Sequence, residues 1–229
     1  MIRRDYFMRM VQEMTQALTR IVFLRKAQDF PQALQEIERV LSKFWNLAPE
    51  QIKSLSLEEW IDLCRREEGP MGEKLIALAD LLKEQDELCL AEAEIPGSGS
   101  PSKAKAESRR SAAIALGLYL EAVSSADTII SVDLLSKIEQ LIEQTQGFRV
   151  PAEVLKRLLG YYEARGMLDK AEDALFDWLD TGDPNAPEGG LAFYERLSQK
   201  SDQELERSRL PRDEIEEGRA ELMSRFSNQ

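Results

Sequence analysis

The sequence predicts an all-α fold, built as an array of antiparallel helical hairpins. Apolar residues recur with a period close to 3.6 through most of the chain, as they do on the buried face of an amphipathic helix. Prolines and S-x-x-E capping boxes precede these periodic segments, where helices begin. No stretch alternates apolar and polar residues for long enough to predict a strand.

The N-terminal part, residues 1–94, is expected to form the first helical hairpins. Its second helix shows the pattern clearly, because Leu34, Ile37 and Leu41 fall on one face. A capping box at Ser56 begins a further helix, which Gly69-Pro70 ends because proline has no N–H for the helical ladder. Besides the helix that begins at Ser56, the helices expected in this part cover about 6–27, 31–44 (the second helix) and 71–92.

Residues 95–104 are expected to form a flexible linker or loop. The stretch Ile95-Pro-Gly-Ser-Gly-Ser-Pro-Ser102 is the one low-complexity segment, and its residues offer little apolar surface to bury. A glycine-rich phosphate-binding loop is the alternative, but the stretch lacks the GxGxxG pattern and no predicted strand precedes it. The chain either divides into two domains at this segment or continues as a single domain.

The C-terminal part, residues 105–229, is expected to continue the array. Pro151 and Pro211 suit the first turn of a helix, and Ser201 begins a second capping box. A loop rich in glycine and proline is expected over 181–190. The expected helices cover about 105–124, 132–146, 151–165 and 169–180, followed by a short one around Tyr194 and a terminal one from Pro211.

One hairpin in this part matches the tetratricopeptide repeat (TPR), a helix–turn–helix unit of 34 residues. With Ala171 at the small position where the two helices cross, the other signature positions hold Leu155, Leu158, Tyr162, Gly166, Leu168, Leu175 and Trp178. Gly166 would permit the turn and Ala171 the close approach of the backbones. Leu159 departs from the pattern, since a small residue is usual there, and Pro184 lies one place late. An irregular helical array without true repeats is the alternative.

The two ends of the chain resemble those of a bacterial family of TPR-like helical proteins. The opening Met1-Ile-Arg-Arg-Asp-Tyr-Phe-Met-Arg-Met10 and the closing Leu210-Pro-Arg-Asp-Glu-Ile-Glu-Glu-Gly218 carry this resemblance, which covers nearly the whole chain. It implies a TPR-like superhelix. It implies no activity, cofactor or ligand, because none is assigned to that family.

Composition and charge narrow the class of protein further. The chain has 42 acidic and 30 basic residues, and its net charge of −12 argues against a nucleic-acid partner because phosphate binding needs a basic surface. No run of 18 apolar residues predicts a membrane span. The two cysteines, Cys64 and Cys89, are too few for a disulfide framework, which favours the reducing cytoplasm.

The residue types needed for most catalytic centres are missing. The chain has no histidine, which removes Ser-His and Cys-His nucleophiles, HExxH zinc sites and the Glu-x-x-His di-iron pattern. We therefore expect a non-enzymatic protein without catalytic, cofactor-binding or metal-binding residues. A carboxylate- or metal-dependent enzyme is a third hypothesis. Its candidate residues are Glu58, Glu59, Glu67, Glu68, Asp169, Asp173, Asp177 and Asp180, which solvated helix faces would also explain.

The expected function is that of an interaction module that binds a protein or peptide or associates with itself. This expectation rests on the fold class alone. The ligand-facing positions of the TPR-like hairpin would be Glu153, Lys156, Gly160 and Glu163. Capture of a terminal carboxylate is not favoured, because Gly160 stands where an asparagine usually accompanies the lysine. A regulatory or nucleic-acid-associated helical protein is the alternative function.

The ends of the chain are expected to take part in association. Residues 1–30 carry six basic and three acidic groups, whereas residues 169–229 carry eight basic and 16 acidic groups. Opposite charge would orient such a pairing, and apolar burial would supply most of its affinity. Tyr6, Phe7 and Met10 would form the association face. Packing of both ends within one monomer explains the same pattern.

Overall fold

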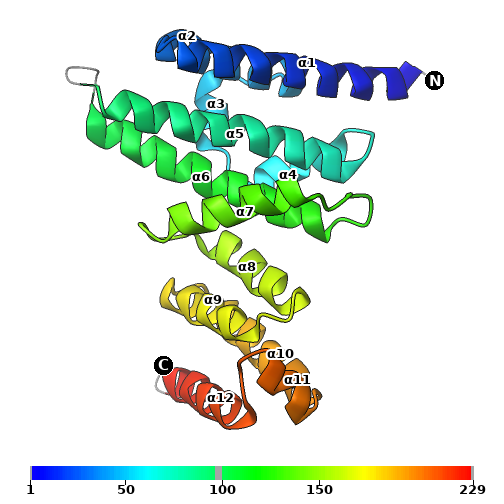
Figure 1. The fold of residues 1–229 in the computed structure, drawn as a ribbon, viewed down its shortest axis with the longest axis vertical. Coiled ribbons are helices and arrows are strands. Elements are labelled where there is room, and N and C mark those ends of the chain that lie inside the picture. The colour runs from blue at the N-terminus through cyan, green and yellow to red at the C-terminus, as the bar shows by residue number, and fades with distance from the viewer. Residues whose placement is uncertain (1, 96–99, 228–229) are drawn as a thin grey trace. The chain divides into compact units, whose positions relative to one another are not determined.

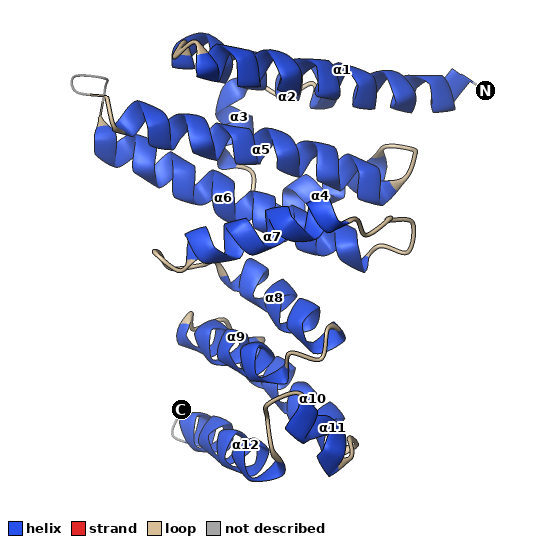
Figure 2. Ribbon diagram, in the orientation of Figure 1, coloured by secondary structure: helices blue, strands red, loops and turns tan. Residues whose placement is uncertain are grey.

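The computed structural model describes residues 2–95 and 100–227, with side chains for residues 9–95 and 100–225. In these ranges the chain forms twelve α-helices and no strand, and it is 80% helical (Figures 1 and 2). The predicted all-α fold is therefore confirmed. The chain divides into two compact units, Met1–Arg149 (unit 1) and Val150–Gln229 (unit 2).

Unit 1 is built around a long antiparallel helix pair, α5 and α6 (Figure 1). Helices α1 and α2 form a hairpin that packs on α5, whereas α4 packs on both central helices and α7 packs on α6. The helices of unit 1 are α1 (Ile2–Lys26), α2 (Phe30–Trp45), α3 (Pro49–Ser54), α4 (Leu57–Arg66), α5 (Met71–Ala93), α6 (Pro101–Ser124) and α7 (Val132–Thr145).

Helix α6 is enclosed by its neighbours along its C-terminal half. All ten residues from 111 to 120 are buried, and their sequence, SAAIALGLYL, is apolar or small on every side. A helix without a polar face is stable in water only where other helices cover its whole circumference. Gly117 shows how close the cover is, since a Cβ atom there would lie 2.3 Å from Leu57 Cδ2 on α4.

A capping box and a lysine of α5 satisfy backbone groups at the two ends of α4. The predicted capping box is present, because the Glu59 N–H donates to Ser56 Oγ and the Ser56 N–H donates to Glu59 Oε2. At the other end, Lys74 Nζ donates to the carbonyl oxygens of Cys64 and Glu67, both at 2.6 Å. A buried cation thus satisfies carbonyls that the helix itself leaves unpaired. Burial lowers the pKa of this lysine.

The division between the units does not coincide with the expected linker at 95–104. Helix α6 begins at Pro101, so the last residues of that segment are helical, and residues 96–99 lie outside the described part of the chain. The segment joins α5 to α6, which pack against each other along their length within unit 1. The division falls instead after Arg149.

Unit 2 contains five helices, beginning with the hairpin that the sequence singled out. Gly166 makes its turn with a φ of +70°, a conformation that only glycine adopts at little cost. Ala171 and Leu175 are fully buried where the two helices meet, and Trp178 donates its indole N–H to Asp183 Oδ2 at 3.0 Å. The helices are α8 (Ala152–Ala164), α9 (Leu168–Asp180), α10 (Ala186–Ser198), α11 (Asp202–Arg207) and α12 (Arg212–Ser227).

The close crossing of α8 and α9 predicts different responses at two alanines. Ala171→Leu should lower the free energy of unfolding by ~1–3 kcal/mol, because the added atoms have no space in a packed core. Ala164→Leu, at an exposed position at the end of α8, should change it by less than about 0.5 kcal/mol. Urea denaturation followed by circular dichroism measures both values. Small effects of equal size would show that α8 and α9 do not cross at Ala171.

Two helical glycines in unit 2 predict opposite effects of the same substitution. A Cβ atom at Gly189 of α10 would lie 2.4 Å from Cζ3 of the rigid Trp178 ring, whereas a Cβ atom at Gly160 of α8 would have nothing within 4 Å. Gly160→Ala should therefore raise stability by roughly 0.5–1 kcal/mol through helix propensity, and Gly189→Ala should lower it. Thermal denaturation of the two variants compares the signs. A higher melting temperature for Gly189→Ala would contradict the packing of α10 on Trp178.

Candidate interaction surface

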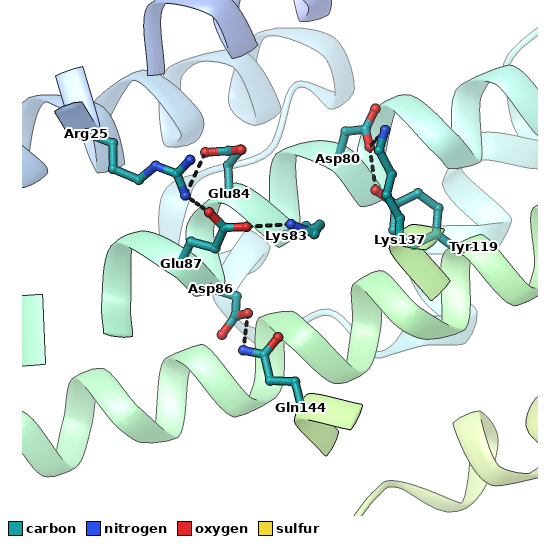
Figure 3. Close-up of polar contacts among 9 residues, drawn as sticks. All are labelled: Arg25, Asp80, Lys83, Glu84, Asp86, Glu87, Tyr119, Lys137 and Gln144. Carbon is teal, nitrogen blue, oxygen red and sulfur yellow. Dashed lines mark hydrogen bonds and ion pairs between the residues drawn. The ribbon is translucent and has the colours of Figure 1, made fainter. Parts of the chain in front are cut away.

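Helix α5 carries polar side chains that lie largely inside unit 1, and they form three clusters (Figure 3). The first cluster joins α1 to α5. Arg25 of α1 forms an ion pair with Glu87, and its Nη1 lies 3.6 Å from Glu84 Oε2. Lys83 also forms an ion pair with Glu87. Two cations and two carboxylates balance one another there, so removal of a single partner would leave an uncompensated charge.

The second cluster joins α5 to α6 and α7. The Tyr119 hydroxyl donates to the carboxylate of Asp80, which also accepts from Lys137 Nζ at 2.8 Å (Figure 3). Burial raises the pKa of Tyr119 strongly, and the neighbouring Asp80 adds to that shift. Burial opposes the charged amine of Lys137, but its bonds to Asp80 and Asp133 raise its pKa overall. Each of the three side chains has a polar partner within this cluster, and Tyr119 has no exposed surface.

The third cluster is centred on Asp86, a carboxyl with no exposed surface. It accepts a hydrogen bond from Ser108 Oγ of α6 and one from Gln144 Nε2 of α7, each at 2.6 Å. Burial raises the pKa of Asp86, although both hydrogen bonds favour the charged form. The cluster links the three helices α5, α6 and α7 through one side chain, which makes it a structural contact.

An exposed apolar segment connects α6 to α7, and its last residue, Val132, is the first residue of α7. It comprises Ile129, Ile130, Ser131 and Val132, and we call it the 129–132 segment. The apolar side chains are 88%, 53% and 86% exposed for Ile129, Ile130 and Val132. Single exposed apolar residues are common, but a contiguous exposed group marks interaction surfaces in soluble proteins.

The 129–132 segment is held at both ends by helix caps. Before it, the Asp127 carboxylate accepts the N–H groups of Met71 at 2.7 Å and Gly72 at 3.2 Å, at the start of α5. Thr128 lies against Gly72, where a Cβ atom would be 1.8 Å from the threonine Oγ1. At its other end, Ser131 Oγ accepts the N–H of Leu134 and caps α7. Figure 1 shows this connection at the end of the α5–α6 pair where α5 begins.

The sequence contained a signal for this segment that our expectations did not use. The stretch Thr128-Ile-Ile-Ser-Val132, in which four of five residues are β-branched, stands where the helices expected to end at 124 and to begin at 132 are joined. Apolar residues outside a periodic segment have no helix face to join, so they must either fold back onto the core or face solvent. The sequence alone does not distinguish these outcomes.

The predicted ligand-facing residues lie along one side of α8. Lys156 and Gly160 are exposed, and Glu153 is half-buried. Glu163 is engaged within unit 2, because its carboxylate accepts two hydrogen bonds from Arg196 of α10, both at 2.7 Å. These bonds raise the pKa of Arg196. Lys156 and Gly160 therefore lie at the surface, whereas Glu163 forms an ion pair with Arg196. The role of this face in ligand binding stays a prediction.

The predicted association face is only partly within the described side chains. Tyr6 and Phe7 lie on α1, but their side chains are outside the described part of the chain. Met10 is 3% exposed and belongs to the interior of unit 1. Association through Tyr6 and Phe7 stays a prediction, and Met10 contributes to the core.

The carboxylates considered for an enzyme occupy helix surfaces or helix ends. The four aspartates of α9 follow its outer side, and Glu59 completes the capping box of α4. Burial, and then the nearby Asp173 and Asp180, raise the pKa of Asp177. Within the described residues, no group of three or more Cys, Asp and Glu side chains is arranged to hold a metal ion.

No described helix combines the length and the apolar character that crossing a bilayer requires.

The observed architecture is that of a helical-hairpin protein with an anchored, exposed apolar segment. A family model matches residues 1–227, and the chain belongs to the family of unknown function DUF6483. The expected membership of a family without an assigned activity is thereby confirmed. Comparison with curated proteins and with solved structures gives no match.

The Asp86 cluster predicts a specific cost for the loss of one hydroxyl. Ser108→Ala would leave the buried Asp86 Oδ1 without its donor and should lower the free energy of unfolding by about 1–3 kcal/mol. Ser102→Ala, an exposed position on the same helix, is the matched control and should change it by less than about 0.5 kcal/mol. Urea denaturation gives the values, and hydrogen exchange should place the loss in α5, α6 and α7. Equal stabilities of the two variants would mean that the hydroxyl does not support Asp86.

Proposed function

We propose that this protein is a non-enzymatic interaction module that binds another polypeptide through the 129–132 segment. The observation that carries the proposal is the exposure of Ile129, Ile130 and Val132 as one group. Burying one such side chain fully contributes about 1.5–3 kcal/mol, so covering all three would supply a substantial part of a binding free energy. The helix caps at Asp127 and Ser131 hold the backbone on both sides, which reduces the entropy lost on binding.

The finer assignments made from the sequence belong to this proposal. A TPR-like arrangement is supported by the α8–α9 hairpin, where Gly166 makes the turn and Ala171 and Leu175 fill the crossing. Such arrays act mainly as binding scaffolds, which is an argument from fold analogy. The proposal also includes a bacterial origin, from the resemblance of the chain ends, and a cytoplasmic location, from the low number of cysteines.

The other functional hypotheses have less support from the described residues. A nucleic-acid-associated role conflicts with the net charge of −12. A carboxylate-dependent enzyme would need converging acidic groups, whereas the aspartates of α9 are spread along its surface. Self-association remains compatible with the proposal, since a second copy is also a polypeptide.

Photo-crosslinking tests the proposed surface directly. With p-benzoylphenylalanine in place of Ile130, irradiation of the cells that make the protein should yield a covalent adduct with another polypeptide. The same group in place of Phe23, an exposed residue of α1, is the positional control and should not yield that adduct. Adding Ile129→Ser and Val132→Ser should abolish the adduct while leaving the melting temperature nearly unchanged, because both side chains are exposed.

Two results would contradict the proposal. One is the absence of any adduct at position 130, and the other is an adduct that forms equally well from position 23. Mass spectrometry of the adduct, together with light scattering of the purified chain, would show whether the bound polypeptide is a second copy.

A further inference from the structure

The charges around the 129–132 segment have one dominant sign. Asp127 and Asp133 flank the segment directly, and Glu73 follows Gly72, the residue on which Thr128 lies. The side chain of Asp133 is 76% exposed. Two cations lie nearby, and both are already engaged. The Lys137 amine pairs with Asp80 at 2.8 Å and with Asp133 at 3.1 Å. Lys74, which interacts electrostatically with Asp127, donates its amine to the carbonyl oxygens of Cys64 and Glu67. The apolar group therefore lies in an acidic surround.

A second copy of the chain fits this surround poorly. A two-fold arrangement of two such segments would place two acidic surrounds against each other, and the repulsion of like charges would oppose association. The apolar area is also small for a dimer. Three side chains offer at most about 350 Å², whereas a stable interface buries about 800 Å² on each partner.

The backbone of the segment is available for pairing. The N–H and C=O groups of Ile129 and Ile130 form no hydrogen bond with another described residue. Residues 128–131 are neither helix nor turn, contain no proline, and are mostly β-branched. Such a segment is suited to main-chain pairing with an extended peptide, in which alternate side chains add specificity.

Resting on the proposed function, we infer that the occupant of the 129–132 segment is an extended apolar peptide segment of another protein, flanked by lysine or arginine. The apolar residues of the peptide would cover Ile129, Ile130 and Val132. Its basic flanks would face Asp127 and Asp133, which would speed association and set the direction of the peptide.

Selection from a phage-displayed library of random 12-residue peptides tests this inference on the full chain. Enriched peptides should combine at least two apolar residues with a net positive charge. Anisotropy of a labelled synthetic copy of the most enriched peptide should show binding at least 10-fold weaker to the Ile129→Ser/Val132→Ser variant. Binding to Phe23→Ser, an exposed apolar position on α1, should be unchanged. Asp133→Asn should weaken binding several-fold, and so should raising the salt concentration.

Four results would overturn the inference. They are a lack of enrichment that depends on the segment, enrichment of acidic or neutral peptides, equal binding by Asp133→Asn, and a dimer that the Ile129→Ser/Val132→Ser variant loses. A crosslinked adduct at position 130 together with neutral or acidic peptides would leave the proposed function standing and remove this inference alone. Failure of both experiments would remove both.

Discussion

The enclosure of α6 is the constraint on which the rest of unit 1 depends. Ten consecutive buried residues, 111–120, leave this part of the helix no face for solvent, so other helices must cover it there on all sides. Small residues make the cover possible, since Gly117 lets Leu57 approach where a methyl group would clash. The polar groups taken inside with these helices are paired across them, as Asp86 is with Ser108 and Gln144.

The same constraint leads to the 129–132 segment. Because α7 packs on α6, the chain must turn back at the end of α6. It does so over the start of α5, where Asp127 takes up two free N–H groups and Thr128 fits against Gly72. Four residues then remain between this anchor and the body of α7, and their apolar side chains face solvent. The exposed group is thus held in place by the packing of unit 1, which is what a binding site requires.

The sequence was sufficient to predict the helices. It could not predict which side chains of different helices contact each other. Helical periodicity predicted the fold class, and the capping boxes at Ser56 and Ser201 are both present. The polar residues of α5 could not be assigned to the interior, because Asp86 finds its partners 22 and 58 residues away. The division after Arg149 and the burial of Met10 likewise depend on which helices pack together. Glu163 shows the same limit, since its position on α8 was predictable and its bond to Arg196 was not.

Amide hydrogen exchange at Ile129 and Ile130 tests the central claim most directly, namely that an anchored and unpaired segment becomes covered by a polypeptide. In the free chain both amides should exchange rapidly, because they form no hydrogen bond with a described residue, while those of Leu116 and Leu118 in the enclosed part of α6 should exchange slowly. In the presence of the polypeptide captured at position 130, the amides of Ile129 and Ile130 should become protected. Slow exchange in the free chain, or unchanged exchange in the complex, would contradict the account.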